Sequence, residues 1–334
     1  MDSENITCHK WILHPNTNHD LTLTQVNEKL VLRFLGGMSL VCFLISIGLV
    51  GNAHVLYIYT RIFKPGSNYR IFVIFLAMLD VFNLAVSAPM VVYYLVHPVT
   101  YPSDIFCKIF RFVMYFANVA STSALIVIAI DRGQRTLAPF RKKTTPRQAK
   151  LMCAVSLLVA LLLAWPTPLL YGVDNVPTGF HNLHGYRCLA EDINPIYITT
   201  FLICQTSFFF VVSLSLCIVY GLLGWKIYKY GVVKRKSATS RRESETTERQ
   251  VTKSTFTLVI VTLVYIFSSL PHHILAPMYF LIPDFDCELT LPHAIVYYTF
   301  IYSCFVNNAI NPFIYGFRDR KFGREMRKLY GFDA

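Results

Sequence analysis

Long apolar runs alternate with short polar segments along this 334-residue chain. Seven of the runs approach or exceed the roughly 20 residues that a helix needs to cross a bilayer. They lie at residues 34–60, 70–96, 104–136, 147–171, 194–230, 249–281 and 290–316. The pattern predicts an all-α membrane protein built as a seven-transmembrane helix bundle. Prolines inside several runs fit this prediction, because neighbouring helices can satisfy the backbone groups that a proline frees.

The composition agrees with a chain that lies largely in lipid. Hydrophobic residues make up 54% of it and charged residues 15%, whereas soluble domains carry about 25% charged residues. The net charge is +12, but no basic, aromatic-interleaved polar domain accompanies it, so nucleic acid is not an expected partner. The first residues lack the pattern of a cleavable signal peptide, and we expect the first apolar helix to direct insertion.

The positions of the basic residues predict the orientation in the membrane. Of the 31 lysines and arginines, 25 lie after the first, third and fifth runs or in the C-terminal tail. Lysine and arginine are retained on the cytoplasmic side, so the N-terminus is predicted to be extracellular. We therefore expect an extracellular segment at 1–29, a seven-helix transmembrane domain at 30–317, and an amphipathic helix with a short cytoplasmic tail at 318–334. The expected location is the plasma membrane.

Two polar segments on the predicted cytoplasmic side have different patterns. The tail alternates basic and apolar residues at helical spacing, which predicts a helix lying on the inner membrane surface. The apolar residues expected to dip into the lipid are Phe317, Phe322, Met326 and Leu329. Residues 234–254 are rich in serine, threonine and charge, and predict either a mobile loop or an extension of the flanking helices.

The cysteines outside the apolar runs all lie on the predicted extracellular side of the membrane. Five of the nine lie inside apolar runs, and the other four, Cys8, Cys107, Cys188 and Cys287, lie in the four predicted outer segments. Thiols on the oxidising side predict two disulfides. On the same side, Asn5 begins an Asn-Ile-Thr sequon, which predicts N-glycosylation.

Polar motifs inside the runs point to a family. Asp80 lies in the middle of the second run, where an ionisable group is costly and marks a functional site. Asp131-Arg132 ends the third run, and Asn311-Pro312-Phe313-Ile314-Tyr315 lies in the seventh. In this order on seven predicted spans, with Gly51-Asn52 in the first run and Pro271 in the sixth, they make the chain resemble a rhodopsin-like (class A) G-protein-coupled receptor. It most resembles the peptide-receptor branch.

That resemblance implies ligand-triggered activation of a heterotrimeric G protein. The residues it assigns to the switch are Asp131, Arg132, Tyr220, Asn311, Pro312 and Tyr315. It also implies a sodium site formed by Asp80, Ser121, Asn307 and Asn311. A polar network that only holds the helices in register is the alternative for these four. No other metal and no cofactor is expected.

The same resemblance implies how the outer cysteines pair. Cys107 and Cys188 match the disulfide that holds the second outer loop across the pocket mouth in this family. Cys8 and Cys287 resemble an additional bridge that some peptide receptors carry.

Two substitutions narrow the ligand class. Met114 stands where an amine receptor of this family has its carboxylate, and Phe305 stands where an opsin has its lysine. The predicted ligand pocket consists of Arg111, Met114, Tyr115, Asn118, Gln205, Phe209, His272, His273, Ala276, Tyr298 and Tyr302. For each histidine, an interhelical hydrogen bond is an equal alternative to ligand contact.

Three functions remain open. The preferred one is a receptor for a neuropeptide-like ligand, because acidic residues in the outer segments could steer a basic or amidated peptide. A solvated loop surface is the equal alternative for these acidic residues. The second is a receptor for a small acidic or lipid ligand with Arg111 as the counter-ion. The third is a transporter or channel, although no internal repeat is visible. No metal triad, nucleophile elbow or phosphate loop suggests an enzyme.

The chain also departs from the family pattern at two important places. Ser269 occupies the position, two residues before Pro271, where the family has an aromatic residue thought to sense ligand. Gly133 follows Arg132, where an aromatic residue is usual. We therefore expect the ligand trigger and the G-protein face to differ from the family pattern.

Overall fold

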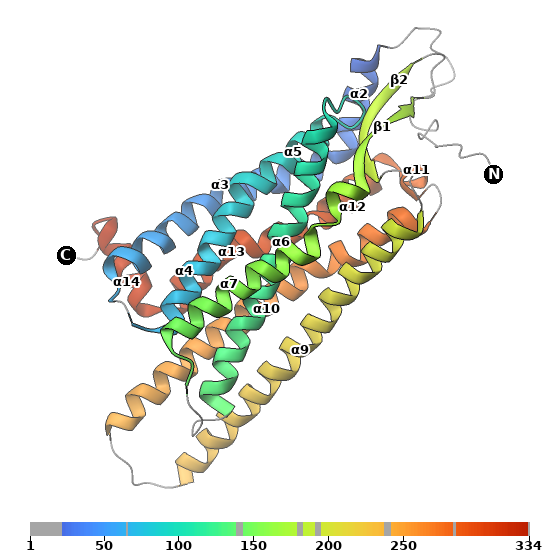
Figure 1. Ribbon diagram of the computed structural model, residues 1–334. Helices are drawn as coiled ribbons and strands as arrows, with labels where there is room; N and C mark the ends of the chain where they lie inside the picture. The colour runs from blue at the N-terminus through green and yellow to red at the C-terminus, as the bar shows by residue number, and fades with distance from the viewer. Residues whose placement is uncertain are drawn as a thin grey trace.

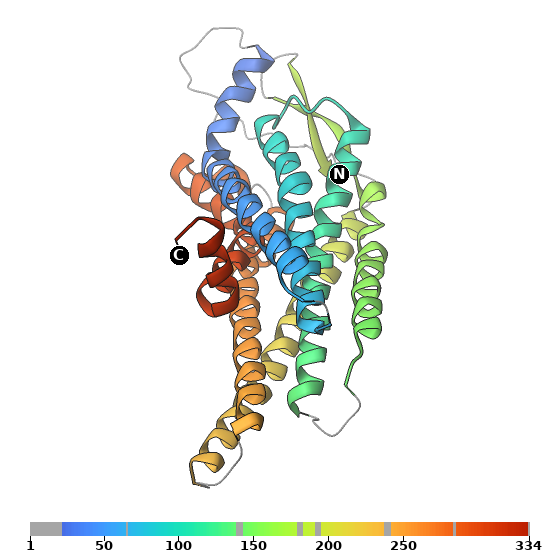
Figure 2. The same ribbon diagram turned by 90° about the vertical axis from the view of Figure 1, so that its left-hand side faces the viewer.

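The structure is a computed structural model that describes residues 22–64, 66–137, 143–178, 183–190, 195–236, 242–282 and 285–332. Its long helices stand side by side in one elongated bundle (Figures 1 and 2). A β-hairpin lies at one end, and α9 and α10 extend beyond the other. We call the hairpin end the outer end and the opposite end the inner end, following the orientation predicted from charge.

The elements follow the predicted runs closely. The bundle contains α3 (Leu35–Tyr57), α4 (Asn68–Phe82), α5 (Ala88–Val96), α6 (Asp104–Leu137), α7 (Pro146–Ala164), α8 (Thr167–Leu170), α9 (Pro195–Lys236), α10 (Arg242–Leu281), α12 (Leu291–Ile301) and α13 (Val306–Arg318). Single-turn elements link them: η1 (Leu32–Phe34), η2 (Ile58–Ile62), η3 (Asn83–Ser87) and η4 (Ser303–Phe305). Around the bundle lie α2 (Leu23–Val31), β1 (Tyr171–Pro177), β2 (His184–Ala190), α11 (Phe285–Glu288) and α14 (Arg320–Leu329).

Six helical stretches of the described chain are long and apolar enough to cross a membrane. A helix suits that role because it satisfies its own backbone groups where no water is present. The seventh predicted span is not one continuous α-helix: α12 ends at Ile301 and α13 begins at Val306, with η4 between them. Of the two alternatives for residues 234–254, helix extension is correct where the chain is described, because α9 continues to Lys236 and α10 begins at Arg242.

The outer end contains a β-hairpin that the sequence did not predict. β1 pairs antiparallel with β2, and Val173 lies opposite Cys188. The loop before α6 extends this sheet, because Tyr186 N–H donates to the Val99 carbonyl at 2.8 Å and Tyr101 N–H donates to the Tyr186 carbonyl at 2.9 Å. The expectation of an all-α chain is therefore correct for the bundle but incomplete outside it.

Helix α2 was also not predicted, since residues 1–29 looked uniformly polar. Its N-terminus is closed by a capping box in which Thr22 and Gln25 satisfy each other's backbone N–H groups. Such a box is a recognised start signal for a helix. Val26 is buried against Val99 and Val176, so α2 packs onto the loop and hairpin at the outer end.

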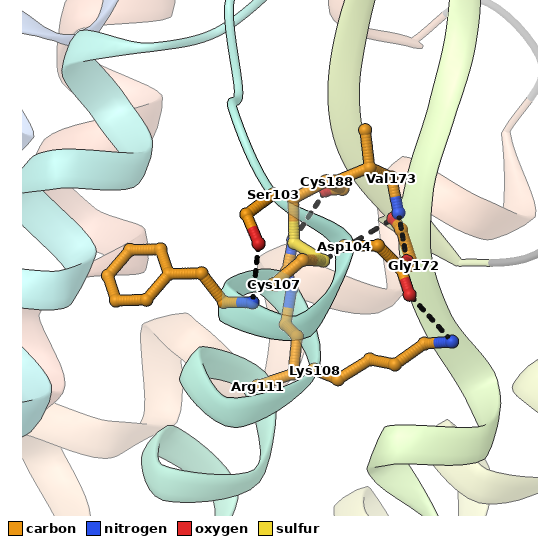
Figure 3. The surroundings of a disulfide bond; sticks show 9 residues. Ser103, Asp104, Cys107, Lys108, Arg111, Gly172, Val173 and Cys188 are labelled. Atoms are coloured by element: carbon orange, nitrogen blue, oxygen red, sulfur yellow. Dashed lines mark hydrogen bonds and ion pairs between the residues drawn. A yellow bond between two sulfur atoms is a disulfide. The ribbon is translucent and has the colours of Figure 1, made fainter.

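A disulfide joins the hairpin to the bundle (Figure 3). Cys107, in the first turns of α6, is bonded to Cys188 of β2, with the Cα atoms 5.6 Å apart. Asp104 adds a second link, because its Oδ1 accepts the Val173 N–H at 2.9 Å and its Oδ2 pairs with Lys108 Nζ at 3.0 Å. The predicted Cys107–Cys188 bond is thus confirmed. Cys8, the side chain of Cys287 and the Asn5 sequon lie outside what the structure describes.

Helix α14 corrects the prediction for the tail. The Phe322 side chain is fully buried and packs on the rings of Tyr59, at 5.9 Å between centroids, and Tyr315, at 6.5 Å. Its predicted insertion into lipid is wrong, because Asp319 caps α14 and turns it under the bundle: Asp319 Oδ1 accepts the Phe322 N–H and Oδ2 accepts the Tyr59 hydroxyl. Phe317 and Leu329, by contrast, are 87% and 46% exposed.

Helix α6 is central to the packing, with contacts to α4, α5, α7, α8 and α9. It contributes Ala120 and Leu125 to the core of the inner half, and Phe110 and Met114 to the core of the outer half. Large apolar side chains such as Phe267 remain exposed on the outside of the bundle, which suits contact with lipid.

Glycines in α3 allow α13 to approach closely. A Cβ added at Gly48 would lie 2.9 Å from the Cβ of Ala309, and one added at Gly51 would lie 2.8 Å from Cγ of Pro312. Small residues at helix interfaces permit such approach in membrane proteins. Gly133 differs, because the nearest atom to an added Cβ, Cγ1 of Val219, is 3.9 Å away.

These contacts predict opposite effects for two alanine substitutions. Gly48→Ala should lower the free energy of unfolding by about 1–3 kcal/mol, the usual cost of overpacking. Gly133→Ala should raise it by about 1 kcal/mol, because alanine favours a helix over glycine. Thermal unfolding of both variants in lipid nanodiscs tests this. An unchanged or higher melting temperature for Gly48→Ala would show that α3 and α13 are not so close.

The hairpin anchor gives a second prediction. Cys107→Ser opens a loop of 81 residues, and loss of such a cross-link should cost about 4 kcal/mol. Hydrogen exchange should increase first in β1 and β2, since the disulfide joins them to α6. The exposed Cys42, which is not disulfide-bonded, provides the control: Cys42→Ser should leave exchange in the hairpin as it is. Equal exchange in the two variants would contradict an anchoring role.

Candidate functional site

One cavity lies between the helices beneath the hairpin, and all eleven residues of the predicted pocket line it. They come from α6, α9, α10, α12 and the link after α12. Sequence reasoning missed residues that reach the cavity from α5 and from the hairpin, namely Tyr94, Tyr171, Arg187, Leu189 and Ala190. The implied Cys107–Cys188 disulfide was the signal that places this loop at the cavity, but no local pattern indicated that the loop forms a hairpin or which of its side chains reach the cavity.

The Arg111 guanidinium is held by aromatic rings and by the disulfide-bonded strand. Its Cζ lies 4.7 Å from the ring centroid of Tyr171, 4.8 Å from that of Tyr94 and 5.2 Å from that of Phe110. Its Nη2 donates to the Cys188 carbonyl at 3.1 Å. Its Nε has no hydrogen-bond partner among the described residues. Cation–π contacts of this kind stabilise a charge that has left water.

Two further hydrogen bonds hold polar side chains of the cavity wall. The hydroxyls of Tyr115 and Tyr171 are 3.1 Å apart, and burial raises the pKa of the Tyr171 hydroxyl well above its usual range. Gln205 Nε2 donates to the Leu163 carbonyl of α7 at 3.1 Å. Both contacts orient side chains that line the cavity.

The two histidines of α10 each use one ring nitrogen inside the protein. His272 Nδ1 is 2.9 Å from the Ile301 carbonyl of α12, and His273 Nδ1 is 2.9 Å from the Ser269 carbonyl. The His273 ring stacks on Phe209, with centroids 3.9 Å apart. Both histidines also line the cavity, so a structural hydrogen bond and contact with a ligand are compatible.

The cavity extends inward to Ser121 and Asn307, next to a buried polar cluster. Asn311 Nδ2 donates to Asp80 Oδ2 at 2.8 Å, which joins α13 to α4. Four buried oxygens have no hydrogen-bond partner among the described residues: Asp80 Oδ1, Ser121 Oγ, Asn307 Oδ1 and Asn311 Oδ1. They belong to the four residues predicted for the sodium site. Orphaned buried oxygens in a native fold call for an additional partner, such as a water or an ion.

A hydroxyl pair joins α6 to α10 near Ser269, where the sequence lacks the usual aromatic residue. The hydroxyls of Thr122 and Tyr265 are 2.9 Å apart, and both side chains are buried. One turn further out, the Ser303 hydroxyl donates to the Ser268 carbonyl at 2.7 Å. Sequence reasoning missed both contacts, because serine, threonine and tyrosine are common in membrane helices without such partners.

The inner end of α6 holds a buried charge cluster. Arg132 is only 4% exposed; its Nη2 lies 3.3 Å from Asp131 Oδ2 and its Cζ lies over the Tyr69 ring at 5.4 Å. Asp131 also pairs with Arg135 Nε at 2.9 Å and accepts a hydrogen bond from Asn68 Nδ2 at 2.8 Å. The sequence indicated the first pair but not Asn68, which arrives from α4.

The remaining residues predicted for the switch are buried on α9 and α13. Tyr220 is buried on α9. Tyr315 is buried on α13, where its ring packs against Tyr59 at 6.3 Å and against Phe322. Asn311 and Pro312 precede it on the same helix and are buried as well. In this conformation Tyr315 therefore belongs to the aromatic group that seats α14.

Comparison with known proteins agrees with this arrangement. The family model for 7 transmembrane receptors (rhodopsin family) matches residues 51–315. The growth hormone secretagogue receptor type 1 of Mustela putorius furo is 23% identical, over 90% of this chain and 82% of its own length. The neuromedin-U receptor 2 of Mus musculus is 24% identical (85% and 72%), and the somatostatin receptor type 5 of Rattus norvegicus is 28% identical (87% and 75%). The chain belongs to the rhodopsin family of seven-transmembrane receptors.

Proposed function

We propose that this protein is a plasma-membrane receptor with an extracellular N-terminus that binds a peptide and activates a heterotrimeric G protein. The observation that carries the proposal is the arrangement of α6. Its outer half lines a cavity through Arg111, Met114 and Tyr115, and its inner end carries the buried Asp131–Arg132 pair. One rigid helix thus connects a ligand-sized cavity with a charge switch.

The relatives support a peptide as the ligand. They are peptide receptors, named for neuromedin U, somatostatin and substance P. The family is one of receptors, which sets aside the transporter, the channel and the enzyme. Met114, which is buried in the cavity wall, offers no carboxylate to an amine ligand.

A specific observation favours the second candidate, a small acidic or lipid ligand. The guanidinium of Arg111 lines the cavity, and no ion pair joins it to a described residue. Of the acidic outer residues, Asp104 is already engaged by Lys108 and by the Val173 N–H. The chemistry of the ligand at Arg111 is taken up below.

The switch is proposed to act through the partners of Arg132. In the described conformation Asp131 holds it, while Asn68 and Arg135 share the same carboxylate. Outward movement of α10 would open the inner end and release the guanidinium toward a G-protein helix. Charge-assisted hydrogen bonds are strong but reversible, which suits a two-state contact.

Four oxygens support sodium as an allosteric ion. Sodium is a hard cation, and oxygen ligands of the kind left unpartnered on Asp80, Ser121, Asn307 and Asn311 suit such cations. When bound, the ion would neutralise the Asp80 carboxylate and favour the conformation in which these oxygens converge. Asp80 and Asn311 already meet through their hydrogen bond.

The switch predicts that Arg132→Ala abolishes G-protein activation without abolishing ligand binding. Purified protein in nanodiscs, with an agonist found by screening a peptide library, should catalyse nucleotide exchange at least about tenfold more slowly, as expected when a charge-assisted contact is lost. Arg135→Ala is the matched control, since Arg135 contacts the same carboxylate but is not assigned to the switch. Full activation by Arg132→Ala at normal surface expression would refute the receptor mechanism.

The sodium proposal predicts an ion-specific stabilisation. The melting temperature should be higher in sodium chloride than in choline chloride at equal ionic strength, because a ligand that binds only the folded state stabilises it. Asp80→Asn and Ser121→Ala should remove or weaken this difference. Ser123→Ala should preserve it, although its hydroxyl is buried and unpartnered like that of Ser121. A difference that survives in Asp80→Asn would identify the cluster as a purely structural network.

A further inference from the structure

The outer cavity has a strongly one-sided charge. Two guanidinium groups line it, from Arg111 and Arg187. The described residues of the lining include no aspartate and no glutamate. A cavity with this lining repels a cation and attracts an anion.

Arg111 is the group on which the anion would be recognised. It lies one turn after Cys107, directly beneath the hairpin (Figure 3). Its faces are covered by the rings of Tyr94, Tyr171 and Phe110. Its Nη2 uses one hydrogen bond on the Cys188 carbonyl. Its Nε is buried without a hydrogen-bond partner among the described residues, and the residue itself lines the cavity.

The cost of this arrangement indicates the missing partner. A charge taken out of water is expensive unless it is both paired and hydrogen-bonded. The rings and the carbonyl compensate part of that cost, but they supply no opposite charge. The planar guanidinium fork matches a carboxylate, which can accept two parallel hydrogen bonds from it.

We propose that Arg111 binds the free C-terminal carboxylate of the peptide ligand. The inference rests on the proposed function as a peptide receptor and deepens it. The hairpin, bonded to α6 through Cys188, lies across the mouth of the cavity. A peptide that enters past the hairpin with its C-terminus first does not have to fold back on itself. Its terminal carboxylate then reaches the cavity ahead of its other groups.

The test uses matched peptides and does not require G-protein coupling. A panel of short peptides with apolar C-terminal residues is made in three forms: as the free acid, as the C-terminal amide, and as the amide with an internal aspartate. Thermal unfolding of the purified chain in nanodiscs measures binding. Free acids should stabilise the protein at concentrations at least about tenfold lower than their amides, because the amide cannot form the charged pair.

Variants assign this preference to one guanidinium. Arg111→Gln keeps a donor for the Cys188 carbonyl but removes the charge, and should make acid and amide equal. Arg111→Lys keeps the charge without the planar fork, and should retain a reduced preference. Lys108→Gln is the control, since it removes a charge from the same helix at a residue that is not part of the cavity lining and pairs with Asp104; the preference should stay unchanged. Unfolding without peptide reports on the folding of each variant.

The outcomes separate this inference from the proposed function. A panel in which no free acid stabilises the protein better than its amide overturns the inference, and so does a preference that persists in Arg111→Gln. An internal aspartate that restores binding of the amide would replace the terminal carboxylate by a side chain and likewise overturn it. Free acids that bind through Arg111 but never activate a G protein would instead contradict the proposed function alone.

Discussion

Charged side chains lie inside a bundle that has little water to solvate them, and the need to partner them determines how several helices meet. Asp131 forms an ion pair with Arg132 and also accepts a hydrogen bond from Asn68 of α4, so one carboxylate joins α6 to α4 at the inner end. Asp80 accepts a hydrogen bond from Asn311, which joins α4 to α13 in the middle of the bundle. Each pairing offsets a desolvation cost that would otherwise be several kcal/mol.

The compensation is incomplete at the two places where we propose that something binds. The polar cluster around Asp80 retains buried oxygens without partners, and Arg111 retains an unpartnered Nε. Arg132 at the inner end also has a buried Nε without a hydrogen-bond partner among the described residues, but its Nη2 lies beside the Asp131 carboxylate. Arg111 therefore differs from Arg132 in having no opposite charge beside it among the described residues, and not in unused hydrogen-bonding capacity.

The contact between α6 and α10 lies beside Ser269, where the family resemblance led us to expect an aromatic residue. The buried contact between the two helices is a hydrogen bond between the hydroxyls of Thr122 and Tyr265. A second hydrogen bond, from the Ser303 hydroxyl to the Ser268 carbonyl of α10, lies close by. Hydrogen bonds depend on direction more strongly than ring packing does. Movement of α10 would therefore break defined polar contacts rather than shift a packed ring.

How much could be predicted depended on the range of the interaction. The apolar runs determined the helices, because a chain in lipid must satisfy its own backbone over about 20 residues. Basic residues beside the runs predicted the orientation, and ordered motifs such as Asp131-Arg132 indicated the family. All eleven predicted pocket residues line one cavity; they followed from the family resemblance and not from a local pattern in the sequence.

Other features depended on contacts between distant residues, which no local pattern encodes. The hairpin folds over the bundle and brings Tyr171 and Arg187 to the cavity. Asn68 reaches Asp131 across 63 residues, and Asp319 turns α14 so that Phe322 packs on Tyr59 instead of entering lipid. The sequence by itself determined which segments are helices and which residues carry charge. Only the tertiary structure decided which charges are paired within the protein and which, like Arg111, have no opposite charge beside them among the described residues.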